Sequence, residues 1–131
     1  MTSLVPEVYC SNFSVTKMFY VKVFGFNMEN ENEEQTVASF DLGKTQFILE
    51  EPIPTDTHKN TIKLKKYFSS DIDFSCEVED VNNLYFRIKT LSPNSLCSKI
   101  EEKSLQIDGA IIMQQQFVAR DPDGYRFRFF E

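Results

Sequence analysis

Very few side chains in this sequence have the chemistry of a catalytic nucleophile, a general base or a metal ligand. His58 is the single histidine and lies in a polar stretch, where a solvated loop residue is the usual case. Cys10, Cys76 and Cys97 are odd in number and widely spaced, with no Cys-x-x-Cys pair. The sequence therefore excludes chemistry that needs two histidines, and it predicts neither a disulfide framework nor a zinc site.

Carboxylates are the more plentiful reactive groups, and they set the overall charge. The 20 Asp and Glu against 14 Lys and Arg give a formal charge of −6, which argues against nucleic acid as a partner because phosphate backbones bind basic surfaces. The same balance weakly favours cationic ligands. With 41% hydrophobic and 14% aromatic residues, the 131 residues are sufficient for one globular domain with a real core.

Targeting signals are not evident in the sequence. No apolar stretch of about 18 residues is present for a membrane span, and Met1–Glu7 lacks the basic and apolar regions of a signal peptide. The cysteine spacing fits a reducing compartment. We therefore expect a cytoplasmic protein without membrane association.

The first half of the chain predicts a strand, a helix and then three strands. A short strand is expected over Leu4–Tyr9, followed by a helix over Phe13–Phe24 that begins after Ser11-Asn12 and ends at Gly25. The apolar residues expected on one face of this helix are Val15, Met18, Phe19 and Val23. The expected strands are Phe26–Asn30, Thr36–Leu42 and Thr45–Glu50, with the acidic run 29–34 as a solvated hairpin tip and Gly43-Lys44 as a turn.

The second half repeats this order after an irregular linker at about 52–70. A strand is expected over Ile72–Glu79, and Asp80 caps a helix whose apolar face is formed by Val81, Leu84, Tyr85, Ile88 and Leu91. We then expect a strand or a helical turn near Ser98–Lys103, a loop through Asp108-Gly109 and a strand over Ile112–Arg120. Asp121-Pro122-Asp123-Gly124 predicts a turn, because Pro presets the first turn dihedral and Gly accepts a positive one, and Tyr125–Phe130 is the last strand.

This repetition predicts the fold class α+β, as an internal duplication of one pattern. The whole chain, 1–131, is expected to form a single domain. Its first module covers about 1–55 and its second about 71–131, and each contributes a strand, a helix and about three strands.

Alternation along the strands separates a face covered by the helices from an open face. In the strand after the linker, Phe74 and Cys76 point toward the helix, which leaves Asp73, Ser75 and Glu77 on the open side. The same parity in the other strands places on the open side Glu7, Tyr9, Gln46, Ile48, Glu50, Arg126, Arg128 and Phe130. Such a face is either the solvated side of an antiparallel sheet or the wall of a ligand-binding cavity.

Two segments carry a resemblance to a known family. Residues 19–26, Phe-Tyr-Val-Lys-Val-Phe-Gly-Phe, resemble the FY-x-x-x-LGF end of the first helix of the glyoxalase/bleomycin resistance protein/dioxygenase family, within the vicinal-oxygen-chelate superfamily. Residues 117–125, Phe-Val-Ala-Arg-Asp-Pro-Asp-Gly-Tyr, resemble its F-x-x-x-DPDG hairpin. With the repeated βαβββ order, the resemblance covers essentially the whole chain. It implies two βαβββ modules that form curled mixed sheets around a concave cleft, usually completed by homodimerisation.

In metal-dependent members of that superfamily, His, Gln and Glu side chains of the open face hold a divalent ion. The matching positions here are Val5, Ile48, Asp73 and Arg128, and only Asp73 among them is a possible ligand. The fixed charge of Arg128 would also repel a cation. The resemblance therefore implies the metal-free branch, which includes bleomycin-binding proteins, and we expect no metal, no cofactor and no catalytic residue of the family type.

We predict that a homodimer of this chain binds an amphipathic or cationic small molecule, and we hypothesise that it sequesters an antibiotic. The aromatic candidates would stack on the ligand, and the charged candidates would orient it. The candidate ligand-binding residues are Glu7, Tyr9, Gln46, Ile48, Asp73, Glu77, Phe117, Arg126, Arg128 and Phe130.

Other interpretations of the same residues remain open. The protein could be a lyase, an isomerase or a dioxygenase-like enzyme with a non-standard site, in which Glu7, Asp73 or Glu77 acts as general base. It could also be an interaction module whose basic cluster, Lys59, Lys63, Lys65 and Lys66, docks an acidic partner. Charge pairing of Arg128 or Arg126 with Asp73 would give these side chains a purely structural role.

Overall fold

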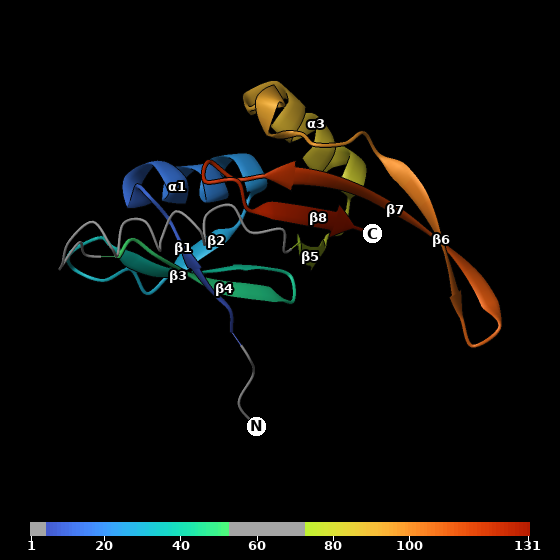
Figure 1. Cartoon of the computed structure of the whole chain (residues 1–131), viewed down its shortest axis with the longest axis horizontal. Coiled ribbons are helices and arrows are strands. Elements are labelled where there is room, and N and C mark those ends of the chain that lie inside the picture. The colour runs from blue at the N-terminus through green and yellow to red at the C-terminus, as the bar shows by residue number, and fades with distance from the viewer. Residues whose placement is uncertain (1–4, 53–72) are drawn as a thin grey trace.

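The computed structural model describes residues 5–52 and 73–131, so His58, the basic cluster and nearly all of the predicted linker lie outside the described residues. The first described segment forms a strand, a helix and three more strands, in the predicted order. These elements are β1 (Glu7–Tyr9), α1 (Phe13–Phe19), the π-helical turn η1 (Tyr20–Phe24), β2 (Asn27–Glu29), β3 (Val37–Leu42) and β4 (Thr45–Glu50). Figure 1 shows α1 lying over this first sheet.

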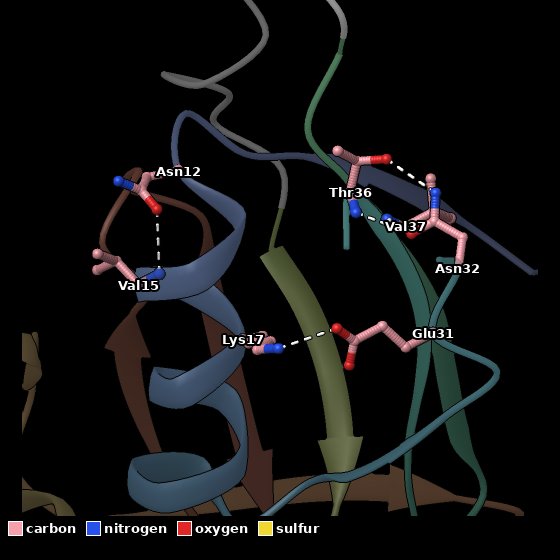
Figure 2. A network of polar contacts seen from close by, with 7 residues as sticks. All are labelled: Asn12, Val15, Lys17, Glu31, Asn32, Thr36 and Val37. Carbon is pink, nitrogen blue, oxygen red and sulfur yellow. Dashed lines mark hydrogen bonds and ion pairs between the residues drawn. The ribbon is translucent and has the colours of Figure 1, made fainter. Parts of the chain in front are cut away.

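Helix α1 begins where the sequence predicts, because Asn12 caps it. The side-chain oxygen of Asn12 accepts a hydrogen bond from the Val15 backbone N–H at 3.1 Å, which satisfies one of the free amide groups of the first turn (Figure 2). The helix ends at Gly25, whose φ of 81° is strained for a residue with a Cβ atom. The last five residues are wound as a π-helix, in which the Tyr20 carbonyl accepts from the Gly25 N–H.

The buried face of this helix differs from the predicted one. The residues that the structure buries are Phe13, Thr16, Tyr20 and Phe24. Val15 and Met18 are exposed instead, and Phe19 and Val23 pack against the core only in part. The prediction was wrong because apolar residues occur on both sides of the helix, and the side with more large aromatic rings buries more apolar surface.

The acidic run after β2 is ordered by side-chain hydrogen bonds as well as solvated. The side-chain oxygen of Asn32 accepts from the backbone N–H groups of Thr36 and Val37 at 2.8 and 2.9 Å. Lys17 of α1 forms an ion pair with Glu31 at 2.9 Å (Figure 2). The loop is therefore attached both to α1 and to the start of β3.

The second described segment repeats the topology of the first. Its elements are β5 (Asp73–Glu77), α3 (Val81–Leu91), the 3-10 turn η2 (Pro93–Ser95), β6 (Glu101–Ile107), β7 (Ala110–Arg120) and β8 (Arg126–Phe130). Among the described residues, one four-stranded sheet has the order β1-β4-β3-β2 and the other has the order β5-β8-β7-β6. In both, the first strand runs parallel to the last and the other neighbours are antiparallel. The α+β fold with two βαβββ modules is thus confirmed.

The β6–β7 hairpin is longer than the sequence predicts. We expected a strand or a helical turn near Ser98–Lys103 and a strand from Ile112, whereas β6 and β7 pair continuously from Glu101 to the turn at Asp108-Gly109. Figure 1 shows the end of this hairpin extending beyond the rest of the second sheet; we call residues 101–113 the arm. Its exposed large apolar residues are Ile107, Ile111, Ile112 and Met113. Apolar side chains on both of its faces hide the alternation that identifies a strand.

The helix-side faces of the two sheets pack into one core. The ring centroid of Phe127, on β8, lies 5.6 Å from that of Tyr20 and 5.9 Å from that of Phe47 in the first module. The Phe129 and Phe24 rings are 5.1 Å apart in the same way. The two modules therefore share their apolar interior. None of the helices within the described residues has the length and apolar character needed to cross a membrane.

The turn between β7 and β8 forms as predicted, and it connects the modules. One oxygen of the Asp121 carboxylate accepts from the backbone N–H groups of Asp123 and Tyr125, each at 2.9 Å. The other oxygen accepts from the buried Tyr20 hydroxyl at 2.5 Å. The Asp123 carboxylate in turn accepts from the Ser11 N–H at 3.0 Å and from the Ser11 hydroxyl at 2.6 Å. The turn thus binds the second module to both ends of the α1 region.

Candidate functional site

Both sheets have the open face that alternation along the strands predicts. Val8 and Leu49 are buried on the helix side of the first sheet, and Phe127 and Phe129 are buried on that of the second. The candidate residues that the strand pairing places on the opposite side are Glu7, Tyr9, Gln46, Ile48, Glu77, Arg126, Arg128 and Phe130. For Asp73 the structure describes the backbone, which lies opposite Arg126 at the start of β5.

Phe117 is a correction to the predicted site. Its ring is 1% exposed and contacts Tyr85 and Phe129 on the helix side of the second sheet. Phe117 pairs with Phe129, so its parity is that of the core rather than that of the open face. Its ring also lines none of the hollows described below, so its assignment as a ligand contact was wrong.

Arg128 lies in the middle of the open face of the second sheet. Its Nη2 donates to the hydroxyl of Ser75, directly opposite on β5, at 2.7 Å. Its Nε is buried without a hydrogen-bond partner in the described part of the chain, and so is the Oε1 atom of Gln116 on β7. Among the side chains that the structure describes, which do not include that of Asp73, no carboxylate lies within 4.0 Å of the guanidinium.

A pocket of about 380 Å³ lies where the two modules meet, and we call it the junction pocket. Its lining residues come from both modules: Pro6, Lys44, Thr45, Gln46, Phe47, Phe74, Ser75 and Phe127. Aromatic walls with a few polar groups are typical of sites that hold small molecules. Because Ser75 both lines this pocket and accepts from Arg128, the guanidinium lies at the margin of the pocket.

Two neighbouring hollows have acidic linings. One of about 270 Å³, on the first sheet, contains Ile48 and Gln46 together with Glu29 and Asp41. Another, of about 430 Å³, lies between the β3–β4 turn and the end of β5 and contains Glu77. Of the predicted residues, Gln46, Ile48 and Glu77 line these three hollows, and Gln46 is common to the junction pocket and the first-sheet hollow. The predicted residues that line none of the three are Glu7, Tyr9, Phe117, Arg126, Arg128 and Phe130.

Sequence reasoning missed most of the junction pocket. Phe47, Phe74 and Phe127 belong to the helix side by parity, so alternation assigns them to the core. They line the pocket because residues of both modules meet there, which no pattern along the chain reports. Lys44 has a turn signal but no ligand signal. Ser75 was placed on the open face, and that position was the available indication.

The metal positions of the resembled family do not fit a divalent ion in this chain. Val5 and Ile48 offer no donor atom, and the Arg128 guanidinium carries only N–H donors, one of which is bonded to Ser75. Among the described residues, no three His, Cys, Asp or Glu side chains converge on one point. The side chains at these positions therefore argue against catalysis by a divalent ion bound there.

Asp121, in the core, is the carboxyl group with the most strongly shifted pKa among the described residues. Burial raises the pKa of Asp121 to about 6, although hydrogen bonds from Tyr20 and from the backbone act in the opposite direction. Burial also raises the pKa of Tyr20 well above its ordinary value. Asp121 is 4% exposed and both its oxygens accept hydrogen bonds, so a substrate has no access to it. Its perturbed pKa reflects a structural role and not catalysis.

Three solved structures resemble this one over nearly the whole chain. A glyoxalase/bleomycin resistance protein/dioxygenase from Alicyclobacillus acidocaldarius has a TM-score of 0.64 at 13% identity, covering 98% of this chain and 89% of its own. TioX from Micromonospora sp. ML1 has a TM-score of 0.64 at 15% identity, with 98% and 94% covered. A protein of unknown function from Agrobacterium tumefaciens strain C58 reaches 0.67 at 17% identity, with 100% and 94% covered. No protein-family model and no curated protein matches the sequence.

This chain therefore has the fold of the glyoxalase/bleomycin resistance protein/dioxygenase superfamily, as the two sequence motifs predicted. At identities of 13 to 17% the likeness concerns the fold, so the activity has to be argued from the site.

Proposed function

We propose that this protein binds a small amphipathic molecule in the junction pocket, without a metal ion and without transforming it. The observation that carries the proposal is the pocket itself. It has a volume of about 380 Å³, aromatic walls from both modules and a short row of polar groups at Lys44, Gln46 and Ser75. Such a site provides apolar contact area and orientation for a ligand, but no described group in it is a strong base or nucleophile.

Sequestration of an antibiotic is the particular form of this function that we propose. It is supported by the fold, because the Alicyclobacillus relative is described as a glyoxalase/bleomycin resistance protein/dioxygenase. A cationic group of such a ligand would fit the hollow on the first sheet, where Glu29 and Asp41 lie beside Gln46. A ligand that occupies both sites would pass over Gln46.

We also propose that the functional form is a homodimer. Ile107, Ile111, Ile112 and Met113 of the arm are between 46% and 72% exposed, although large apolar side chains are usually covered. A hairpin without a third strand or a helix against it is marginally stable in water. A second copy of the chain would cover these side chains.

Calorimetric titration with bleomycin tests sequestration. The expected dissociation constant is micromolar or tighter, with unmodified ligand recovered afterwards by mass spectrometry. Gln46→Trp, which fills space common to both hollows, should weaken binding at least roughly tenfold, because the lost contacts are worth about 1.4 kcal/mol or more. Asn94→Trp, at an exposed position of η2 outside both hollows, is the matched control and should bind like the wild type.

Two results would reject this proposal in different ways. Absence of bleomycin binding removes antibiotic sequestration. Conversion of the ligand, or a stoichiometric metal in protein purified without chelators, favours the alternative enzyme with a non-standard site. The interaction module that uses Lys59, Lys63, Lys65 and Lys66 remains a hypothesis, because those residues lie outside the described ranges.

A further inference from the structure

We propose that the ligand of the junction pocket carries an anionic group, such as a carboxylate or a sulfonate on an aromatic ring, and that this group binds Arg128. The inference rests on the proposed function, since it specifies the ligand class of the same pocket. It also differs from the expectation that a protein with a formal charge of −6 prefers cations.

Arg128 is incompletely hydrogen-bonded within the described part of the chain. A guanidinium has five N–H donors, and here Nη2 bonds to Ser75 while the buried Nε has no partner among the described residues. No carboxylate lies within 4.0 Å of it among the described side chains, which exclude that of Asp73. A buried N–H donor without a partner is costly, and a carboxylate, sulfonate or phosphate oxygen pair satisfies a guanidinium with two parallel hydrogen bonds.

The amide of Gln116 lies beside Arg128 on the same sheet. Strand pairing places Gln116 opposite Phe130 and Val118 opposite Arg128, so Gln116 and Arg128 are diagonal neighbours on the open face. The Oε1 atom of Gln116 is buried and unpaired within the described residues, so the amide is not already bonded to Arg128 Nε. The same side chain also carries an NH₂ group with two donors.

The described wall of the junction pocket contains one charged residue, Lys44. Its polar side chains, at Lys44, Thr45, Gln46 and Ser75, all have hydrogen-bond donors, and no carboxylate is among its described lining residues. The carboxylates near it, such as Asp41 and Glu77, line the neighbouring hollows. The junction pocket is therefore a locally cationic, aromatic site within an acidic protein.

These features combine at one margin of the pocket. Ser75 lines the pocket, and its hydroxyl oxygen is 2.7 Å from Arg128 Nη2. An aromatic ligand ring against the half-buried Phe74 would place a substituent toward Ser75 and Arg128. The rings supply apolar contact, and the guanidinium selects the charge.

A pair of fluorescent probes tests this inference in the full-length protein. Anilinonaphthalene sulfonate and phenylnaphthylamine have the same aromatic rings, but only the first carries a negative charge. In fluorescence titrations of the wild type, the sulfonate should bind roughly tenfold more tightly, as a charged hydrogen bond in a partly buried site gives. Arg128→Gln should reduce this preference to about threefold or less, and Lys44→Gln should reduce it by a smaller factor.

Lys89→Gln, at an exposed position of α3, removes the same charge far from the pocket and should leave the preference unchanged. An equal or reversed preference in the wild type would overturn the anionic inference and leave small-molecule binding standing. So would an unchanged preference in a folded Arg128→Gln protein, or in Lys44→Gln if the first variant does not fold. If neither probe binds, the junction pocket is not a binding site, and both proposals fail.

Discussion

Asp121 is buried and Arg128 is half-buried, and the hydrogen bonding of their polar atoms differs in one decisive respect. The Asp121 carboxylate accepts hydrogen bonds from Tyr20, Asp123 and Tyr125, so its environment is complete without a ligand. Arg128 keeps a buried N–H without a partner in the described part of the chain. A completed polar network stabilises the fold, whereas an incomplete one at the margin of a pocket indicates binding.

The raised pKa of Asp121 predicts a pH dependence of stability. Since its folded-state value of about 6 lies above the ordinary 3.8, the folded protein binds this proton more tightly than the unfolded chain does. The resulting stabilisation is complete below about pH 3.8 and is lost as the pH rises through about 6. Relative to Asp121→Asn, the free energy of unfolding of the wild type should fall by on the order of 3 kcal/mol over this range.

Urea denaturation at a series of pH values measures this difference. Tyr20→Phe removes the hydrogen bond that lowers the Asp121 pKa, so the loss of stability should move to higher pH in that variant. A difference between the wild type and Asp121→Asn that stays constant with pH would contradict the raised pKa.

At the scale of elements, the arm is the part of the fold with the least internal support. Its strands β6 and β7 pair with each other, but β7 residues 110–113, which form the arm, have no β8 partner. Its tip residue Ile111 is 72% exposed. An arm of this kind gains stability only if another surface covers it, which is why we assign it to the homodimer contact.

Ile111→Lys should therefore shift the protein from dimer to monomer, because the ammonium group would have to be desolvated in the contact. Size-exclusion chromatography with light scattering should give a mass near twice 15.3 kDa for the wild type and near 15.3 kDa for the variant. Val15→Lys is the control, since Val15 is a 55% exposed apolar residue on α1 away from the arm. A monomeric wild type, or a variant that stays dimeric, would contradict this contact.

At the scale of the whole molecule, the two modules form one cooperative unit. The helix-side rings of β8 contact rings of η1 and β4, and the β7–β8 turn is hydrogen-bonded to Ser11 and Tyr20. The junction pocket depends on this arrangement because its walls belong to both modules. Loss of the shared core should therefore remove the binding site as well as stability.

Phe127→Ala tests the shared core. Truncation of a buried Phe should lower the free energy of unfolding by roughly 3–5 kcal/mol. Amide hydrogen exchange should report the loss in β3 and in β7 together, because neither module keeps an independent interior. Phe86→Ala, at a 58% exposed position of α3, should change stability by no more than about 0.5 kcal/mol. Faster exchange confined to the second module would show that the modules unfold separately.

The sequence by itself determined the repeated order of elements, the caps at Asn12 and Asp80 and the open faces of the sheets. These features follow from local rules: a short polar side chain bonds to nearby amides, and side chains alternate along a strand. Only the tertiary structure decided which side of α1 is buried, how far the arm extends and that Phe117 belongs to the core. The junction pocket also required the folded chain, because its lining residues are distant in sequence and meet only after folding. Patterns along the chain carry no information on such long-range contacts.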